Sequence, residues 1–221
     1  MVPDVGPLPV AKLKGGLEIT LLSPTPRGLA NLVPRWEEDC KRAGLVEGVG
    51  AEIPRSWQRD EILGFEPESL AKQKYKKDSE PPNGSSIAFI ATYNKRSVLC
   101  GADAHAEVLV QSLERLGRPP HRFSAVKLPH HGSTHNLSPV LVERLRSSRW
   151  LVSTNGARFH HPNPECLARV IMSQTKPKFT FNYVTDEIKD VLSSAGTNYT
   201  VRIPKPELAS YGQGIVTVIE R

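Results

Sequence analysis

The chain has 221 residues, of which 38% are hydrophobic and 24% charged, and its formal net charge is +6. This composition is typical of a globular domain with an apolar core and excludes a disordered chain. Because no run of about 18 or more apolar residues occurs, we expect no transmembrane helix, and residues 1–16 lack the apolar core of a signal peptide.

The N-terminal part of the chain predicts one strand and one helix. Residues 17–23, which follow Gly15-Gly16, are rich in leucine and β-branched side chains and predict a strand. Residues 27–43 place apolar side chains at helical spacing and predict a helix. Residues 46–82 are polar and rich in Pro, Glu, Lys and Ser, so we predict a long loop insertion there.

From Ser85 onward, strands alternate with helices. Residues 87–93 and 97–100 flank Asn94-Lys95 and predict a β-hairpin. The later predicted elements are helices over residues 104–116, 138–145 (with Ser138 as N-cap) and 164–172, and strands over residues 123–128, 150–154, 179–184 and 214–219. This alternation predicts an α/β fold with a layered sheet and flanking helices, and we assign residues 1–221 to a single domain.

Candidate ligands follow three of the predicted strands. These are Asp103, the pair His130-His131 and the pair His160-His161. The ends of strands in open α/β sheets meet at one edge, where sites are built. A carboxylate there can bridge two cations and an imidazole supplies a directional nitrogen ligand. Each residue alone has an ordinary alternative, a turn residue for the aspartate and a surface side chain for each histidine pair.

Five short motifs, taken in order, resemble the metallo-β-lactamase fold. They are Asn83-Gly-Ser-Ser-Ile-Ala-Phe-Ile, Ser-Val-Leu-Cys-Gly-Ala-Asp103, Val-Lys-Leu-Pro-His-His-Gly-Ser133, Val-Ser-Thr-Asn-Gly and His161-Pro162. They are most similar to the soluble domain of competence-type DNA-uptake channels and to its stand-alone relatives. The resemblance covers most of residues 10–221 and implies the C-terminal half of an αββα sandwich.

The resemblance also implies a role for each candidate residue. Asp103 resembles the family's bridging metal ligand, and His131 resembles its late histidine ligand. His130 would serve as a ligand or proton donor beside it, and the choice between His130 and His131 stays open at this point. His161 stands where the family has a further active-site histidine, and Ser133 would orient one of these residues or a substrate phosphate.

Two departures from the family pattern bear on the expected site. The family's Gly-Asp is Gly-Ala-Asp103 here, which offsets the aspartate by one residue. The family's His-x-His-x-Asp-His motif is absent, and no histidine precedes His105. Because a tight zinc centre normally needs three or four protein ligands, Asp103 and His131 make a partial site.

These observations give a hypothesis and two alternatives. We predict a metal-dependent hydrolase that needs a second polypeptide for the missing motif, binds zinc or manganese, and acts on phosphodiesters such as nucleic acids or nucleotides. The net positive charge is compatible with a polyanionic partner, but by itself it favours an ordinary solubilising surface, because many ordinary domains are this basic. The alternatives are a non-catalytic module that acts through protein interaction, and a chain that starts in the middle of a domain.

Cysteine usage points to the cellular compartment. The chain has 3 cysteines, which are widely spaced and odd in number, with no Cys-x-x-Cys pair. This pattern argues against a disulfide framework and a structural zinc ribbon and predicts a reducing cytoplasm.

Overall fold

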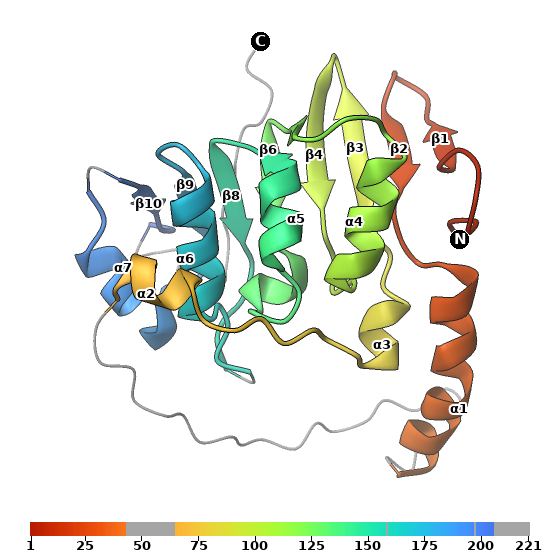
Figure 1. The fold of residues 1–221 in the computed structure, drawn as a ribbon, viewed down its shortest axis with the longest axis horizontal. Helices are drawn as coiled ribbons and strands as arrows, with labels where there is room; N and C mark the ends of the chain where they lie inside the picture. The colour runs from red at the N-terminus through yellow and green to blue at the C-terminus, as the bar shows by residue number, and fades with distance from the viewer. Residues whose placement is uncertain (43–64, 158, 197, 206–221) are drawn as a thin grey trace.

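The computed structural model describes residues 1–42, 65–157, 159–196 and 198–205. In these ranges the chain forms one large mixed sheet with helices packed against it (Figure 1). The strand order is β1-β2-β3-β4-β6-β8-β9-β10. The strands are β1 (Val10–Lys12), β2 (Glu18–Leu21), β3 (Phe89–Tyr93), β4 (Arg96–Cys100), β6 (Ala125–Lys127), β8 (Arg149–Val152), β9 (Lys178–Phe181) and β10 (Thr200–Arg202).

The sheet changes from antiparallel to parallel at β4. Strands β1 to β4 pair antiparallel, whereas β4, β6, β8, β9 and β10 run parallel to their neighbours. The parallel strands therefore end at a common edge, at the bottom of Figure 1, and the loops that follow them lie side by side. The predicted α/β fold class is confirmed at this level.

Helices cover one face of the sheet. Figure 1 shows α4 (Ala106–Glu114), α5 (Pro139–Arg144) and α6 (Pro164–Ser173) in front of the strands. The side chains that point toward them form a row of buried residues through the strand register, namely Ile90, Leu99, Val126, Trp150 and Phe179. This row and the inner faces of the helices make the hydrophobic core.

The opposite face of the sheet stays partly exposed. Residues that alternate with the buried row, such as Phe89, Ala91, Val98 and Leu151, are only half-buried. A strand covered on both faces carries buried side chains on both. Apart from β6, where Ala125 on this face is also buried, the described strands carry their buried side chains on the face that α4, α5 and α6 cover.

The loop insertion predicted over residues 46–82 stays a prediction, and its described part holds two short helical segments. Residues 65–84, here called the strap, contain α2 (Pro67–Ala71) and reach α3 (Pro81–Gly84). Leu70 is buried, and α2 packs against α6. Figure 1 shows the strap crossing the bottom edge of the sheet from α6 to α3. The first part of the prediction, residues 46–64, lies outside the described residues.

Most of the other predicted elements appear with shifted ends. The predicted N-terminal helix is α1 (Pro26–Arg42), and the predicted hairpin is β3-β4, with Asn94 and Lys95 both at positive φ as a tight turn requires. The Ser138 side chain caps α5 by accepting from the Leu141 N–H at 3.1 Å. The predicted strand over residues 214–219 lies outside the described residues.

The structure also contains short elements that the sequence did not predict. They are β5 (His121–Arg122), which pairs with β7 (Leu145–Arg146), and the 3-10 turns η1 (Pro129–Gly132) and η2 (Asp186–Ile188), with α7 (Lys189–Ser193) after the latter. Across the described ranges, no helix combines the length and the apolar character needed to span a membrane.

Candidate functional site

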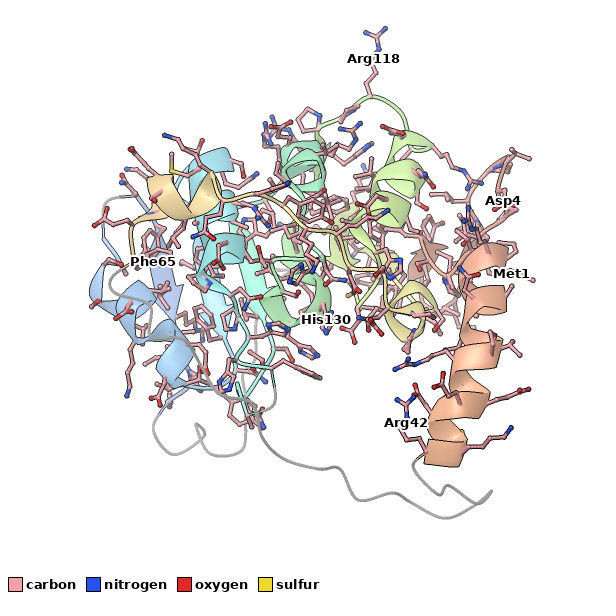
Figure 2. The ribbon with its side chains drawn as sticks, turned by 60° about the horizontal axis from the view of Figure 1, so that its bottom comes forward. Met1, Asp4, Arg42, Phe65, Arg118 and His130 are labelled. Carbon is pink, nitrogen blue, oxygen red and sulfur yellow. The ribbon has the colours of Figure 1, made fainter. Side chains whose placement is uncertain are left out.

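The loops that follow β4, β6 and β8 meet at the bottom edge of the sheet. They carry Asp103, the pair His130-His131 and the pair His160-His161, which are the residues that the sequence singled out. The His130 ring centroid is 6.1 Å from that of His131 and 5.3 Å from that of His161. Figure 2, in which this edge comes forward, labels His130 at its centre. The predicted convergence of these loops is present in the fold.

Backbone strain is concentrated in these loops. Of the seven non-glycine residues with positive φ in the described ranges, four belong to them: Ala102 (φ 47°), His130 (42°), His131 (57°) and His160 (51°). Each such residue costs roughly 1–2 kcal/mol. The inserted Ala102 adopts this conformation, and its carbonyl accepts from the His130 N–H at 2.6 Å. The extra residue of Gly-Ala-Asp is thus absorbed in a turn bonded to the histidine loop.

Two glycines let the loops approach one another. A Cβ on Gly101 would lie 2.8 Å from Pro129 Cγ. A Cβ on Gly132, where φ is 90°, would lie 2.6 Å from Pro162 Cβ. Contacts this short force neighbouring atoms to move. The two glycines therefore set how closely the loops after β4, β6 and β8 pack.

Asp103 and His131 face each other across a gap suited to a cation. The His131 Nε2 lies 3.9 Å from Asp103 Oδ1, and both side chains are about two-fifths exposed, at 43% and 38%. The other His131 ring nitrogen, Nδ1, makes a close hydrogen bond to the Ser153 carbonyl oxygen. Because a carbonyl only accepts, Nδ1 carries a proton, and Nε2 is the ring nitrogen that faces the carboxylate. Of the two neighbouring histidines, His131 is the one that faces the Asp103 carboxylate, and which of them binds a metal stays a prediction.

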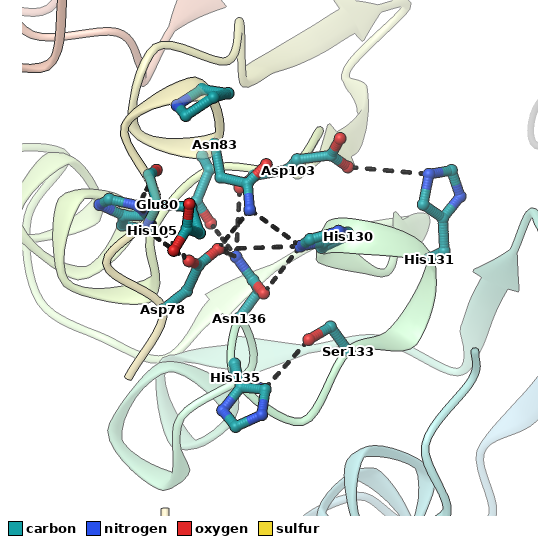
Figure 3. Close-up of polar contacts among 12 residues, drawn as sticks. Asp78, Glu80, Asn83, Asp103, His105, His130, His131, Ser133, His135 and Asn136 are labelled. Carbon is teal, nitrogen blue, oxygen red and sulfur yellow. Dashed lines mark hydrogen bonds and ion pairs between the residues drawn. The ribbon is translucent and has the colours of Figure 1, made fainter. Parts of the chain in front are cut away.

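His130 belongs to a second, more buried network (Figure 3). Its Nδ1 lies 3.0 Å from Asn136 Oδ1 and 3.8 Å from Asp78 Oδ2. Burial alone would lower the pKa of His130, but the Asp78 carboxylate, Asp103 and Asn136 outweigh it and raise the pKa.

Asp78 is held as a carboxylate in this network. Burial favours its neutral form, but hydrogen bonds and His130 outweigh it, so its pKa is well below the ordinary range. The donors are Asn83 Nδ2 at 2.7 Å, Asn136 Nδ2 at 2.8 Å and the Glu80 N–H at 2.9 Å. His105 Nε2 lies 3.9 Å from the other side of the carboxylate.

His161 lies beside His130 and is largely buried. It is 9% exposed, and its Nδ1 is buried with no hydrogen-bond partner in the described structure. Burial, followed by the neighbouring histidines, lowers its pKa to about 3. Phe159 stacks on its ring with centroids 6.0 Å apart. The imidazole is therefore neutral at physiological pH.

Ser133 and His160 face away from the pair formed by Asp103 and His131. Ser133 is 2% exposed, and its Oγ accepts from the His135 N–H at 3.2 Å, so it shapes the turn after the histidine pair. His160 Nδ1 lies 3.0 Å from Glu187 Oε1 and links the loop after β8 to η2.

Sequence reasoning missed Asp78 and Asn136. Asn136 stands three residues after the Lys-Leu-Pro-His-His-Gly-Ser motif. Asp78 ends a basic run in a stretch that is typical of loops, so nothing in the sequence pointed to it. Asn83 opened one of the motifs quoted for the resemblance but carried no predicted role.

The donor atoms fit a divalent metal, but only in part. A neutral imidazole nitrogen and a carboxylate oxygen are ordinary zinc ligands. Among the described residues, however, no group of three or more His, Cys, Asp or Glu side chains is placed to hold one ion. The residues present fit two positions of a coordination shell.

Comparisons with known proteins leave the family open. No protein-family model matches the chain, and neither the curated proteins nor the solved structures contain a match. The functional argument therefore depends on the site itself.

Proposed function

We propose that this chain is the C-terminal half of a metallo-β-lactamase-type hydrolase that acts on phosphodiesters once a second polypeptide supplies the remaining metal ligands. The observation that carries the proposal is the 3.9 Å separation of Asp103 Oδ1 and His131 Nε2. Two ligand atoms of one tetrahedral zinc ion lie about 3.4 Å apart, so a small closure of the two side chains would bring them to that spacing. The gap is too wide for a hydrogen bond and compatible with a shared ion.

Each of the chain's own residues would have a distinct role in this site. Asp103 and His131 would hold the ion, and the Ser153 carbonyl would keep the His131 ring in the required tautomer. A bound divalent ion lowers the pKa of a coordinated water and stabilises charge on a phosphoryl oxygen. His130 would stand beside the reacting groups, and the neutral His161 would pack behind it.

The uncovered face of the sheet supports the need for a partner. Its half-buried residues include Phe89, Ala91 and Val98, an apolar surface across the adjacent strands β3 and β4. In an αββα sandwich this face packs on the sheet of the other half, and such sheet-on-sheet contacts bury the facing apolar side chains. A partner on this face would complete both the core and the metal site.

The phosphodiester substrate class is supported by two features of the sequence. It depends on the resemblance of the Lys-Leu-Pro-His-His-Gly-Ser motif and on the net charge of +6. A non-catalytic interaction module is the second candidate, because the described residues offer one ion only two of these ligands. Metal binding alone does not distinguish the hydrolase from the non-catalytic module, so catalysis must be measured as well.

Zinc binding tests the metal site directly. In titration calorimetry of the full chain with zinc, we expect Asp103→Asn and His131→Ala each to weaken binding by more than the roughly 10- to 100-fold that loss of an outer partner costs. His121→Ala, on β5, is the matched control and should bind as the wild type does. Unchanged affinity in both site variants would overturn the metal assignment.

Activity then separates the two candidates. The wild-type chain, loaded with zinc or manganese and combined with the polypeptide that supplies the missing motif, should cleave bis(4-nitrophenyl) phosphate. Asp103→Asn should abolish the cleavage. Metal binding by the assembled complex without any phosphodiester cleavage would favour the non-catalytic module.

A further inference from the structure

One buried amide connects both parts of the candidate site. Asn136 is fully buried, at 0% exposure, and lies in the turn after the histidine pair. Its Nδ2 is 2.8 Å from Asp78 Oδ2, 3.1 Å from the Asp103 carbonyl oxygen and 3.3 Å from the Ala104 carbonyl oxygen. Its Oδ1 is 3.0 Å from His130 Nδ1 (Figure 3).

The acceptors around Asn136 decide which way its amide points. Three oxygens that only accept surround one end of the side chain, so the NH₂ group must lie there. The amide oxygen then faces His130 Nδ1, and that nitrogen must carry a proton to complete the hydrogen bond. The His130 lone pair is left on Nε2, on the other side of the ring.

Asp78 is itself fixed from the strap. Its side chain is 7% exposed and accepts from two side-chain amides and one backbone N–H. The strap is anchored beside it, since the Asp78 N–H and the Tyr75 hydroxyl both donate to the His135 carbonyl oxygen, at 3.2 Å and 2.9 Å. His135 Nδ1 returns a contact of 2.6 Å to the Lys76 carbonyl oxygen.

We propose that Asn136 and Asp78 form a positioning pair: Asp78 orients the Asn136 amide, and Asn136 holds His130 in its Nδ1-protonated tautomer while tying down the loop that carries Asp103. The pair contacts no reacting atom and acts through His130 and the Asp103 backbone. This inference rests on the proposed function for its purpose, but the tautomer of His130 can be measured without metal or substrate.

A hydrogen bond from Asn83 to His130 would favour the opposite tautomer, with the proton on Nε2. Asn83 Nδ2 lies 3.4 Å from the same His130 nitrogen and could donate to a lone pair there, which would place the proton on Nε2. That contact is longer than the 3.0 Å contact to Asn136, and Asn83 already donates to Asp78 at 2.7 Å. The Asp78 carboxylate 3.8 Å away also favours a proton on Nδ1.

Nitrogen-15 NMR of the imidazole rings, at alkaline pH where His130 is neutral, tests the proposal in the metal-free full chain. We expect the wild type to show the Nδ1-protonated tautomer at His130. Asn136→Ala and Asp78→Asn should shift the population toward the Nε2-protonated form, whereas the matched control Asn83→Ala should keep the wild-type tautomer. Circular dichroism establishes that each variant is folded.

Zinc affinity gives the second readout. Asn136→Ala should raise the zinc Kd by about 10- to 100-fold, because the Asp103 loop loses its anchor. An Nε2-protonated His130 in the wild type, or an unchanged tautomer in folded Asn136→Ala, overturns the inference. A wild type with the expected tautomer but no zinc binding instead overturns the proposed function and leaves the positioning contact standing.

Discussion

At the scale of single residues, His161 illustrates how burial sets protonation. Its pKa falls from 6.5 to about 3, first through burial and then through His130, His131, His135 and His160. The unfolded chain binds a proton at this residue below pH 6.5, whereas the folded chain does not until about pH 3. Because the unfolded state binds more protons in that window, the free energy of unfolding falls as the pH is lowered through it.

Replacing this histidine should flatten the acid limb of the stability curve. We expect His161→Gln to remove a slope of at most about 1.4 kcal/mol per pH unit between the two pKa values. Urea unfolding of both proteins across this range measures it, with the region above the ordinary pKa as the baseline. Parallel curves for the variant and the wild type would show that the folded-state pKa of His161 is not depressed.

The sequence predicted the candidate ligands but not the residues that support them. Strand ends and the Pro-His-His-Gly-Ser motif identified Asp103, His131 and His161, because strand order brings such loops to one edge. The division of labour between His130 and His131 depends on what each Nδ1 meets, the Asn136 amide or the Ser153 carbonyl. Such contacts come from tertiary packing, so local sequence patterns do not encode them.

At the scale of elements, the strap makes packing contacts that its sequence pattern does not predict. Its run of lysines is typical of a solvated loop, yet Phe65 and Leu70 are buried at its start and Tyr75 is half-buried further on. Phe65 packs edge-on against Tyr199, with centroids 6.3 Å apart, and Arg169 lies over the Tyr75 ring. Isolated apolar residues in a polar stretch lack the periodicity that predicts an element.

Truncating Leu70 should therefore destabilise the fold more than truncating an exposed residue does. We expect Leu70→Ala to lower the free energy of unfolding by about 2–5 kcal/mol, as for other buried leucines. It should also increase hydrogen exchange at Asp78 more than in the β3-β4 hairpin, because α2 fixes the strap on α6. Lys72→Ala, at an exposed position two residues later, is the control and should stay within about 0.5 kcal/mol of the wild type. Equal effects of both variants would mean that the strap is not anchored by α2.

At the scale of the whole molecule, the two faces of the sheet differ in burial, and the alternation of polar and apolar residues along the strands predicts this difference. A parallel strand covered on both faces is a continuous apolar run. In β6, β8 and β9, polar side chains such as Lys127, Arg149 and Thr180 instead alternate with the buried row. The neighbouring strands β3 and β4 carry apolar residues on the face opposite the helices. The polar side chains of the strands beyond them bound this apolar area. Apolar patches rimmed by polar groups are typical of interaction sites, so the proposed partner would dock here.

A dye that binds exposed apolar surface can test whether this face is open in the isolated chain. We expect anilinonaphthalene sulfonate to fluoresce with the native chain and to lose most of that signal in Val98→Lys, because a charge at the centre of the apolar area disfavours dye binding. Val140→Lys on α5 replaces an apolar residue that is 48% exposed on the helical side, and it should leave the signal unchanged. Both variants should unfold cooperatively near the wild-type temperature, since neither residue lies in the buried row. Absence of dye binding to the native chain would mean that this face is already covered, and the argument for a partner there would fail.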